Sequence, residues 1–189
     1  MLINPGHPIN CVFLSDPEPA LLKQPKELEM KTISQLILQL KAQSCIHENV
    51  LPLYPLFEDY RGLDWKGYLS SGANTAVLHQ DERFRLSLIG WDGFQKSKKH
   101  GHPEGGGLMK LLSRALLETR FDPIFPEQII GKHRYEPGDL AYIHDEIAYH
   151  IVENPFPQPA VSLHLYAPGN YASKVMPPDS RGLEWGAAA

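Results

Sequence analysis

The sequence predicts a mainly β protein that is preceded by a helical N-terminal part. The 189 residues include 17 prolines and 15 glycines, as a turn-rich β protein needs. Apolar and polar side chains alternate along residues 84–91 and 160–166, as they do in strands with two different faces. Helix is predicted near the N-terminus because apolar residues between positions 28 and 40 recur mostly at steps of three and four.

Composition indicates one globular domain and argues against two classes of partner. A chain of this length can bury a real core, and its hydrophobic fraction of 42% is ordinary. The net charge of −4 has no block of like charges, so nucleic acid is not an expected partner. No apolar run reaches the length of a membrane span, and the first residues lack the features of a signal peptide. The only cysteines, Cys11 and Cys45, fit a reducing compartment, so we expect a cytoplasmic protein.

The chain divides in order into four parts. Residues 1–20 are rich in turn-forming residues and predict a surface arm with one short strand at 11–14. Residues 21–72 predict a helix over 21–45 and then turns and loops, in which Tyr60 and Trp65 are interpreted as core. Residues 73–180 carry the predicted strands, and residues 181–189 are interpreted as a flexible tail. The oligomeric state is not predicted.

Residues 75–91 predict a pair of strands. In the second strand Phe84, Leu86 and Leu88 share one face. The opposite face carries the side chains of Arg85, Ser87, Ile89 and Trp91. Arginine side chains are usually solvated, so Arg61, Arg83 and Arg85 are interpreted as surface charges, with the alternative that one of them reaches inward to a binding site.

Two separate stretches carry histidines with the pattern of a metal site. His100 and His102 are one residue apart, so in an extended segment their side chains point the same way. His150 begins a strand that follows a polar turn. Imidazole suits iron, zinc, copper or nickel, and the third histidine strengthens a His-x-His pattern that is weak by itself.

Together with Gly93, these stretches resemble the two motifs of the cupin barrels. The second motif opens as Gly131-x5-Pro137 and closes with a histidine four residues before Asn154. In the first motif, glycines stand where cupins usually carry an acidic ligand. The resemblance implies a double-stranded β-helix barrel over residues 73–180. It also implies a metal site without a carboxylate, made of His100, His102 and His150.

Residues 110–119, 142–154 and 160–168 resemble the cysteine dioxygenase family of thiol dioxygenases. Polar residues recur in them at fixed offsets inside apolar strands. The resemblance covers roughly residues 30–180 and implies an iron(II) enzyme that oxidises a small thiol, cysteine or a related one, to its sulfinic acid with O2. It also implies strands over residues 108–121, where residue content alone would favour a helix.

The last predicted strand carries three polar side chains on one face, Ser162, His164 and Tyr166. Buried polar groups need partners, so these residues form either a structural hydrogen-bond chain or a catalytic relay. The resemblance implies the relay, in which the serine orients the histidine and the histidine holds the phenol toward the bound substrate. It also implies that Ile89 and Trp91 line the substrate pocket, although ordinary barrel core is the alternative.

One feature of the family is missing from the sequence. The resembling enzymes carry an arginine for the substrate carboxylate about nine residues before Phe84, where Thr75 stands. Threonine cannot form the paired hydrogen bonds of a guanidinium, so we expect weakened carboxylate recognition. Two alternatives therefore stay open. One is a three-histidine iron oxygenase acting on a non-thiol metabolite, and the other is a metal-binding cupin without oxygen chemistry.

Overall fold

The computed structural model describes residues 30–69, 74–171 and 175–176 of the chain. The expected arm with its strand at 11–14, the start of the expected N-terminal helix and the expected tail lie outside these residues. The division of the chain at residues 20, 72 and 180 stays a prediction. The helical elements are α1 (Ile33–Lys41), α2 (Tyr54–Asp59) and two 3-10 turns, η1 (Leu51–Leu53) and η2 (Asp64–Gly67).

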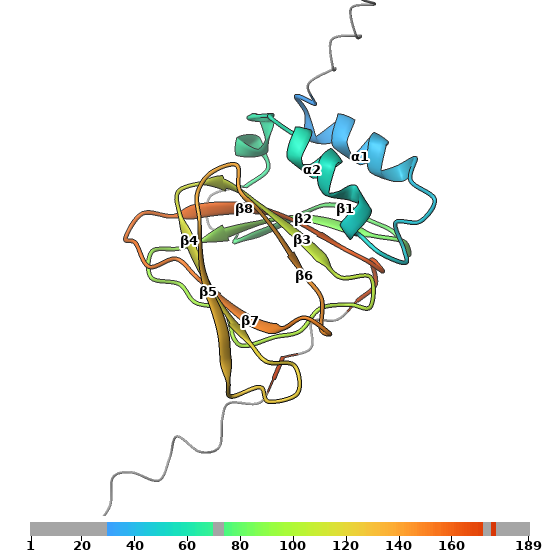
Figure 1. Cartoon of the computed structure of the whole chain (residues 1–189). Helices are drawn as coiled ribbons and strands as arrows, with labels where there is room; N and C mark the ends of the chain where they lie inside the picture. Colours follow the sequence, from blue (N-terminus) through green and yellow to red (C-terminus); the bar gives the residue numbers. More distant parts are fainter. Residues whose placement is uncertain (1–29, 70–73, 172–174, 177–189) are drawn as a thin grey trace, which may run out of the picture.

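The eight described strands form two antiparallel sheets that face each other (Figure 1). One sheet has the order β1-β2-β8-β3-β6 and the other has the order β5-β4-β7. The strands are β1 (Thr75–Gln80), β2 (Arg85–Trp91), β3 (Gly107–Ser113), β4 (Leu116–Phe121), β5 (Ile129–Tyr135), β6 (Leu140–Ile143), β7 (Tyr149–Glu153) and β8 (Ala160–Tyr166). This arrangement confirms the mainly β fold of the cupin, double-stranded β-helix type.

The segment over residues 108–121 is strand, as the family resemblance implied. β3 pairs with both β6 and β8, and β4 pairs with both β5 and β7. These long-range ladders satisfy the backbone groups of the segment, and this tertiary pairing overrides its local helix propensity.

Helix α1 is shorter than the sequence predicted. It begins after Thr32, whose side chain accepts a hydrogen bond from the backbone N–H of Gln35, while the Gln35 side chain accepts from the Thr32 N–H. This reciprocal capping box fixes the start of the helix. The helix ends at Lys41, and residues 42–45 form turns.

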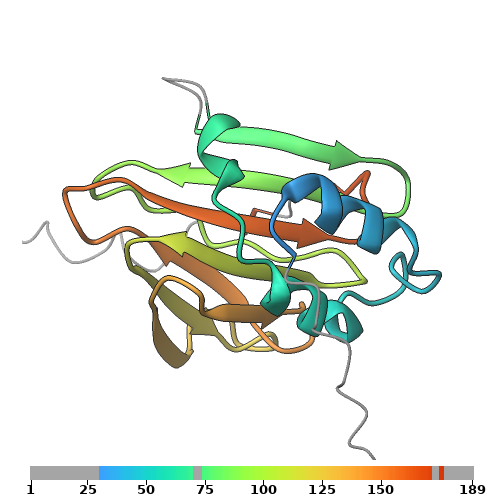
Figure 2. The same ribbon diagram turned by 90° about the horizontal axis from the view of Figure 1, so that it is seen from above.

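The helices cover the outer face of the five-stranded sheet (Figure 2). Leu36 and Leu40 of α1 belong to the same buried cluster as Leu86, Leu88 and other outward-facing strand residues. Tyr60 and Trp65 also belong to this cluster, which confirms their interpretation as core. A second cluster, which includes Trp91, Met109 and Leu111, contains residues of both sheets. Because both faces of β2 and β8 are covered, their inward-facing polar residues are buried beside the interior of the barrel.

One buried cation ties α2 to the barrel. Lys110 of β3 is 3% exposed. Its ammonium group donates hydrogen bonds at 2.7–2.8 Å to the carbonyl oxygens of Phe57, Glu58 and Tyr60. These carbonyl groups stand at the end of α2, where the helix dipole favours a positive charge. In the described part of the chain, no helix has the length and apolar character required to cross a membrane.

Candidate metal centre

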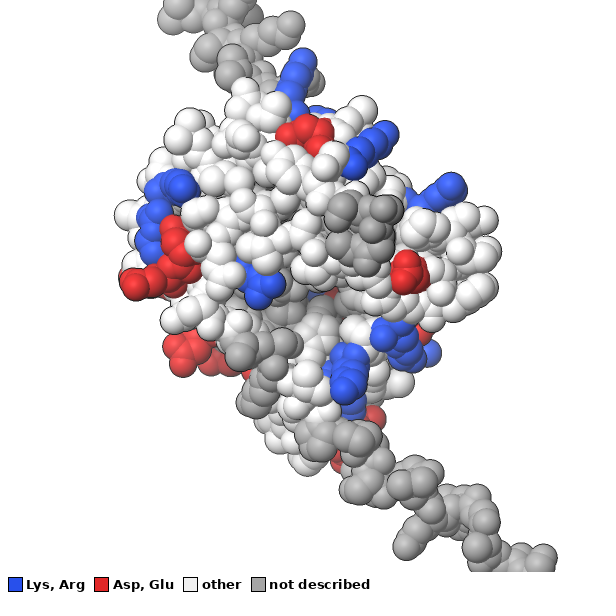
Figure 3. All heavy atoms as spheres, turned by 180° about the vertical axis from the view of Figure 1, so that it is seen from behind, with Lys and Arg blue, Asp and Glu red and all other residues white. Residues whose placement is uncertain are grey.

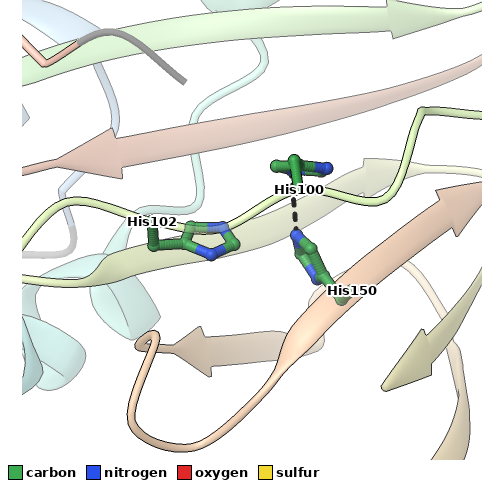
Figure 4. Close-up of side chains that lie close together, drawn as sticks. All are labelled: His100, His102 and His150. Carbon is green, nitrogen blue, oxygen red and sulfur yellow. Dashed lines mark hydrogen bonds between the residues drawn. The ribbon is translucent and has the colours of Figure 1, made fainter. Parts of the chain in front are cut away.

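The fold brings together the three histidines that the sequence singled out. His100 and His102 precede β3, and His150 lies on β7 (Figure 4). The backbones of His100 and His150 pair through two hydrogen bonds of 3.0 and 3.1 Å. The backbone N–H of His102 donates to the Asp145 carboxylate in the turn before β7. One ring nitrogen from each histidine lies within 4.8 Å of the corresponding nitrogen of the other two.

The hydrogen bonds of two rings leave lone pairs facing each other. Nδ1 of His100 is 2.9 Å from the carbonyl oxygen of Lys98, and Nδ1 of His150 is 2.6 Å from Oε1 of Glu118. Both acceptors require a hydrogen on Nδ1, so in the neutral rings each Nε2 carries a lone pair. The two Nε2 atoms are only 3.1 Å apart. Nδ1 of His102 is a buried nitrogen without a hydrogen-bond partner. A metal ion between the rings would relieve the repulsion of the lone pairs, so the residues fit a metal site.

Burial keeps these imidazoles in the form that binds metal. Burial and the neighbouring His150 lower the pKa of His100 to about 4. The same two causes hold the pKa of His102 well below its ordinary value. A neutral imidazole at physiological pH has a nitrogen lone pair available for a metal ion.

The carboxylate behind His150 was not singled out by the sequence. Glu118 of β4 is 1% exposed, and its Oε2 accepts hydrogen bonds from the phenol of Tyr135 at 2.7 Å and from Nε of Arg120 at 2.8 Å. Burial raises the pKa of the Glu118 carboxyl. The hydrogen bonds from His150 and Tyr135 and the charge of Arg120 outweigh this effect and lower that pKa to about 2. Glu118 is therefore an ionised group that fixes the ring orientation of His150.

The polar face of β8 forms a continuous hydrogen-bond chain. Oγ of Ser162 is 2.7 Å from Nε2 of His164, and Nδ1 of His164 is 2.8 Å from the phenol oxygen of Tyr166. The indole N–H of Trp91 donates to Oγ of Ser162 at 2.8 Å. Burial lowers the pKa of His164 to about 3 and raises the pKa of Tyr166. This hydrogen-bond chain therefore contains a neutral imidazole, that of His164, and a protonated phenol, that of Tyr166.

A cavity of about 430 Å³ opens beside the histidines. His100, His150, His164 and Tyr166 line it together with Ile89 and Trp91. Ile89 and Trp91 thus lie at the pocket wall, where the resemblance placed them, and Trp91 also belongs to the inner core cluster.

Two residues of the strand pair, Thr75 and Arg85, also line this cavity. The interpretation of Arg85 as a surface charge is therefore wrong, because the alternation of β2 turns it inward with Ser87 and Ile89. Arg61 is exposed, as expected, whereas Arg83 is half-buried outside the described lining of the cavity.

Comparison with known proteins agrees with the geometry of the site. Residues 22–174 match the family described as cysteine dioxygenase type I. The cysteine dioxygenase type 1 of rat is 38% identical over 123 residues, which cover 61% of this chain and 56% of the rat protein. The zebrafish cysteine dioxygenase type 1 is 31% identical over 134 residues, which cover 64% of this chain and 66% of that protein. The chain thus spans about three-fifths of the length of these relatives.

A solved structure of an uncharacterised conserved protein with a double-stranded β-helix domain, from Klebsiella pneumoniae, is 17% identical with a TM-score of 0.48. The match covers 60% of this chain and 94% of that one.

Proposed function

Because this chain belongs to the cysteine dioxygenase family, we propose that it is a non-haem iron(II) thiol dioxygenase. Its reaction would oxidise a small thiol, cysteine or a related one, to the sulfinic acid and incorporate both atoms of O2. The observation that carries the proposal is the convergence of His100, His102 and His150 beside a cavity that the phenol of Tyr166 also lines.

We propose that the three histidines hold the iron. Iron(II) in a site of three neutral ligands keeps its full charge and open coordination positions, which favours binding of a thiolate and of O2. Glu118 supports this role from behind, since it fixes the hydrogen on Nδ1 of His150 and so leaves Nε2 free for the metal.

The polar residues of β8 are proposed to control protons at the substrate. Tyr166 keeps its proton because burial raises its pKa, so it can donate a hydrogen bond to a developing negative charge in the cavity. His164 and Ser162 hold the phenol in place through the bonds of 2.8 and 2.7 Å. Ile89 and Trp91 give the cavity an apolar wall, which limits the water around the reacting groups.

The setting of the reaction belongs to the same proposal. The partners are a small-molecule thiol and O2, and the compartment is the cytoplasm. The low cysteine content supports a reducing compartment, as does Cys45, which is an exposed free thiol.

Metal analysis followed by oxygen uptake tests this function. The purified protein is expected to contain iron and to consume one O2 per thiol while a sulfinate appears. The thiols to compare are cysteine, cysteamine, 3-mercaptopropionate and homocysteine. His150→Asn should abolish uptake, whereas the matched change His133→Asn, at an exposed position of β5, should not.

Two outcomes would replace the proposal. Iron without thiol-dependent uptake would favour an oxygenase for a non-thiol metabolite. Zinc or nickel without any uptake would favour a metal-binding cupin without oxygen chemistry.

A further inference from the structure

The described lining of the cavity carries basic side chains but no acidic one. Arg85 and Lys98 line it, and no aspartate or glutamate is among the described residues that do. Seen from the face opposite to that of Figure 1, the molecule is hollowed, and Lys and Arg side chains lie close to the margin of the hollow (Figure 3). A pocket with this charge pattern favours an anionic ligand and disfavours a cationic one.

Arg85 is held at the cavity by a neighbour on its own strand. It begins β2 and pairs in register with Tyr166 of β8, so its backbone lies beside that of the tyrosine. Its Nε donates to Oγ of Ser87 at 3.1 Å, and Ser87 is 2% exposed. The guanidinium is close enough to the phenol that its charge opposes the rise in the pKa of Tyr166.

The outer nitrogens of this guanidinium have no acceptor within the described part of the chain. Arg83, Arg120 and Arg134 each pair with a carboxylate, at distances of 3.8, 2.8 and 2.7 Å. No described carboxylate pairs with Arg85. A partly buried guanidinium that keeps two N–H faces free beside a cavity is ready for two parallel hydrogen bonds to a planar anion.

We propose that Arg85 is the residue that selects the substrate, by pairing with the carboxylate of a short thiol carboxylic acid whose sulfur faces the histidines. This inference rests on the thiol dioxygenase function proposed above and names its substrate class. The carboxylate would thus be bound by an arginine at another position, and its recognition would not be weakened. Arg85 lies at the end of the β1–β2 pair opposite to Thr75. No described acidic group of the lining can pair with an ammonium group, so an amine on the substrate adds little to binding.

Binding without turnover tests the inference independently of the oxidation. The iron-loaded protein is titrated calorimetrically under anaerobic conditions with 3-mercaptopropionate, cysteine, 2-mercaptoethanol and cysteamine. We expect 3-mercaptopropionate to bind about 10- to 100-fold more tightly than the neutral 2-mercaptoethanol, as charge-assisted hydrogen bonds predict. Cysteine should bind within about threefold of 3-mercaptopropionate, and cysteamine should bind most weakly.

Variants at Arg85 locate the source of this preference. Arg85→Gln should abolish the tighter binding of 3-mercaptopropionate and leave the affinity for 2-mercaptoethanol unchanged. Arg85→Lys should retain part of the preference for 3-mercaptopropionate, because a point charge remains. The matched control is Arg83→Gln. Arg83 lies two residues before Arg85 and is not part of the described lining of the cavity, so this variant should behave like the wild type.

The outcomes separate the two proposals. Equal binding of the carboxylate and neutral thiols by the wild type would overturn the inference even if Arg85→Gln failed to fold. The inference would also be overturned if a folded Arg85→Gln variant still bound 3-mercaptopropionate more tightly than 2-mercaptoethanol. If anion binding depends on Arg85 but no thiol supports oxygen uptake, the inference about the anion site stands and the proposed reaction fails.

Discussion

Replacing Glu118 by glutamine should weaken metal binding although it changes only one atom of the side chain. Three donors converge on this carboxylate, the Nδ1–H of His150, the phenol of Tyr135 and Nε of Arg120. A glutamine offers one oxygen and one NH2 group, so at least one donor must face another donor. If the NH2 group faces the histidine, the ring has to move its hydrogen to Nε2 and loses the lone pair that would bind the metal.

The size of the effect follows from this choice between two unfavourable arrangements. If the NH2 group turns instead toward Arg120, this half-buried cation loses the only carboxylate that it pairs with among the described residues, which also costs free energy. Loss of such a supporting group typically lowers metal affinity about 10- to 100-fold, or by about 1.4 to 2.7 kcal/mol.

Anaerobic competition with a chromogenic chelator measures this affinity directly. The matched control is Glu153→Gln, also on the β4–β7 pair, whose half-exposed carboxylate pairs with Lys96 at 3.2 Å. Its metal affinity should equal that of the wild type, since exposed ion pairs contribute little. Wild-type affinity in a folded Glu118→Gln would refute the idea that this carboxylate sets the tautomer of His150.

Three further predictions concern stability and turnover. Lys110→Met leaves three carbonyl groups without their donor and should lower the free energy of urea unfolding by about 2 to 4 kcal/mol, whereas the exposed Lys132→Met should change it by less than about 0.5 kcal/mol. Tyr166→Phe should fold normally but lower the initial rate of thiol-dependent oxygen uptake by about 10²-fold or more; near-normal turnover would exclude a role for the phenol. The folded-state pKa of His164, about 3, lies below its unfolded value of 6.5, so its contribution to stability should be lost as the pH falls from 6.5 toward 3. The stability difference between wild type and His164→Gln should therefore shrink by about 1 kcal/mol or more between pH 7 and pH 4.5, and a constant difference would contradict this.

The features that the sequence predicted well are those that repeat with a fixed period or spacing. Alternation along 84–91 and 160–166 identified β2 and β8 and the faces of their side chains. The spacing of the two histidine motifs, together with the family resemblance, selected three residues that the fold brings together although His100 and His150 are 50 positions apart. No local pattern could supply that contact, because the pairing of the two segments depends on the closure of the barrel.

The features that the sequence did not reveal depend on what surrounds a single side chain. Arg85 shares a face with Trp91, but most arginines are solvated, and only the position of the cavity shows that this one faces inward. Glu118 lies on a strand face between Leu116 and Arg120, a pattern that also fits an exposed edge. Its partner Tyr135 comes from β5, so its burial became visible only in the assembled sheet.

The contact between Trp91 and Ser162 gives the hydrogen bonds of β8 a direction. An indole N–H can only donate, so the serine oxygen accepts from it and has one hydrogen of its own to place. Within the described residues the remaining partner is Nε2 of His164, which must then accept, and Nδ1 of that ring becomes the donor to the phenol oxygen. The hydrogen of Tyr166 is thereby left to point away from His164, so a tryptophan on a neighbouring strand helps to leave the phenol free to donate to a molecule in the cavity that Tyr166 lines.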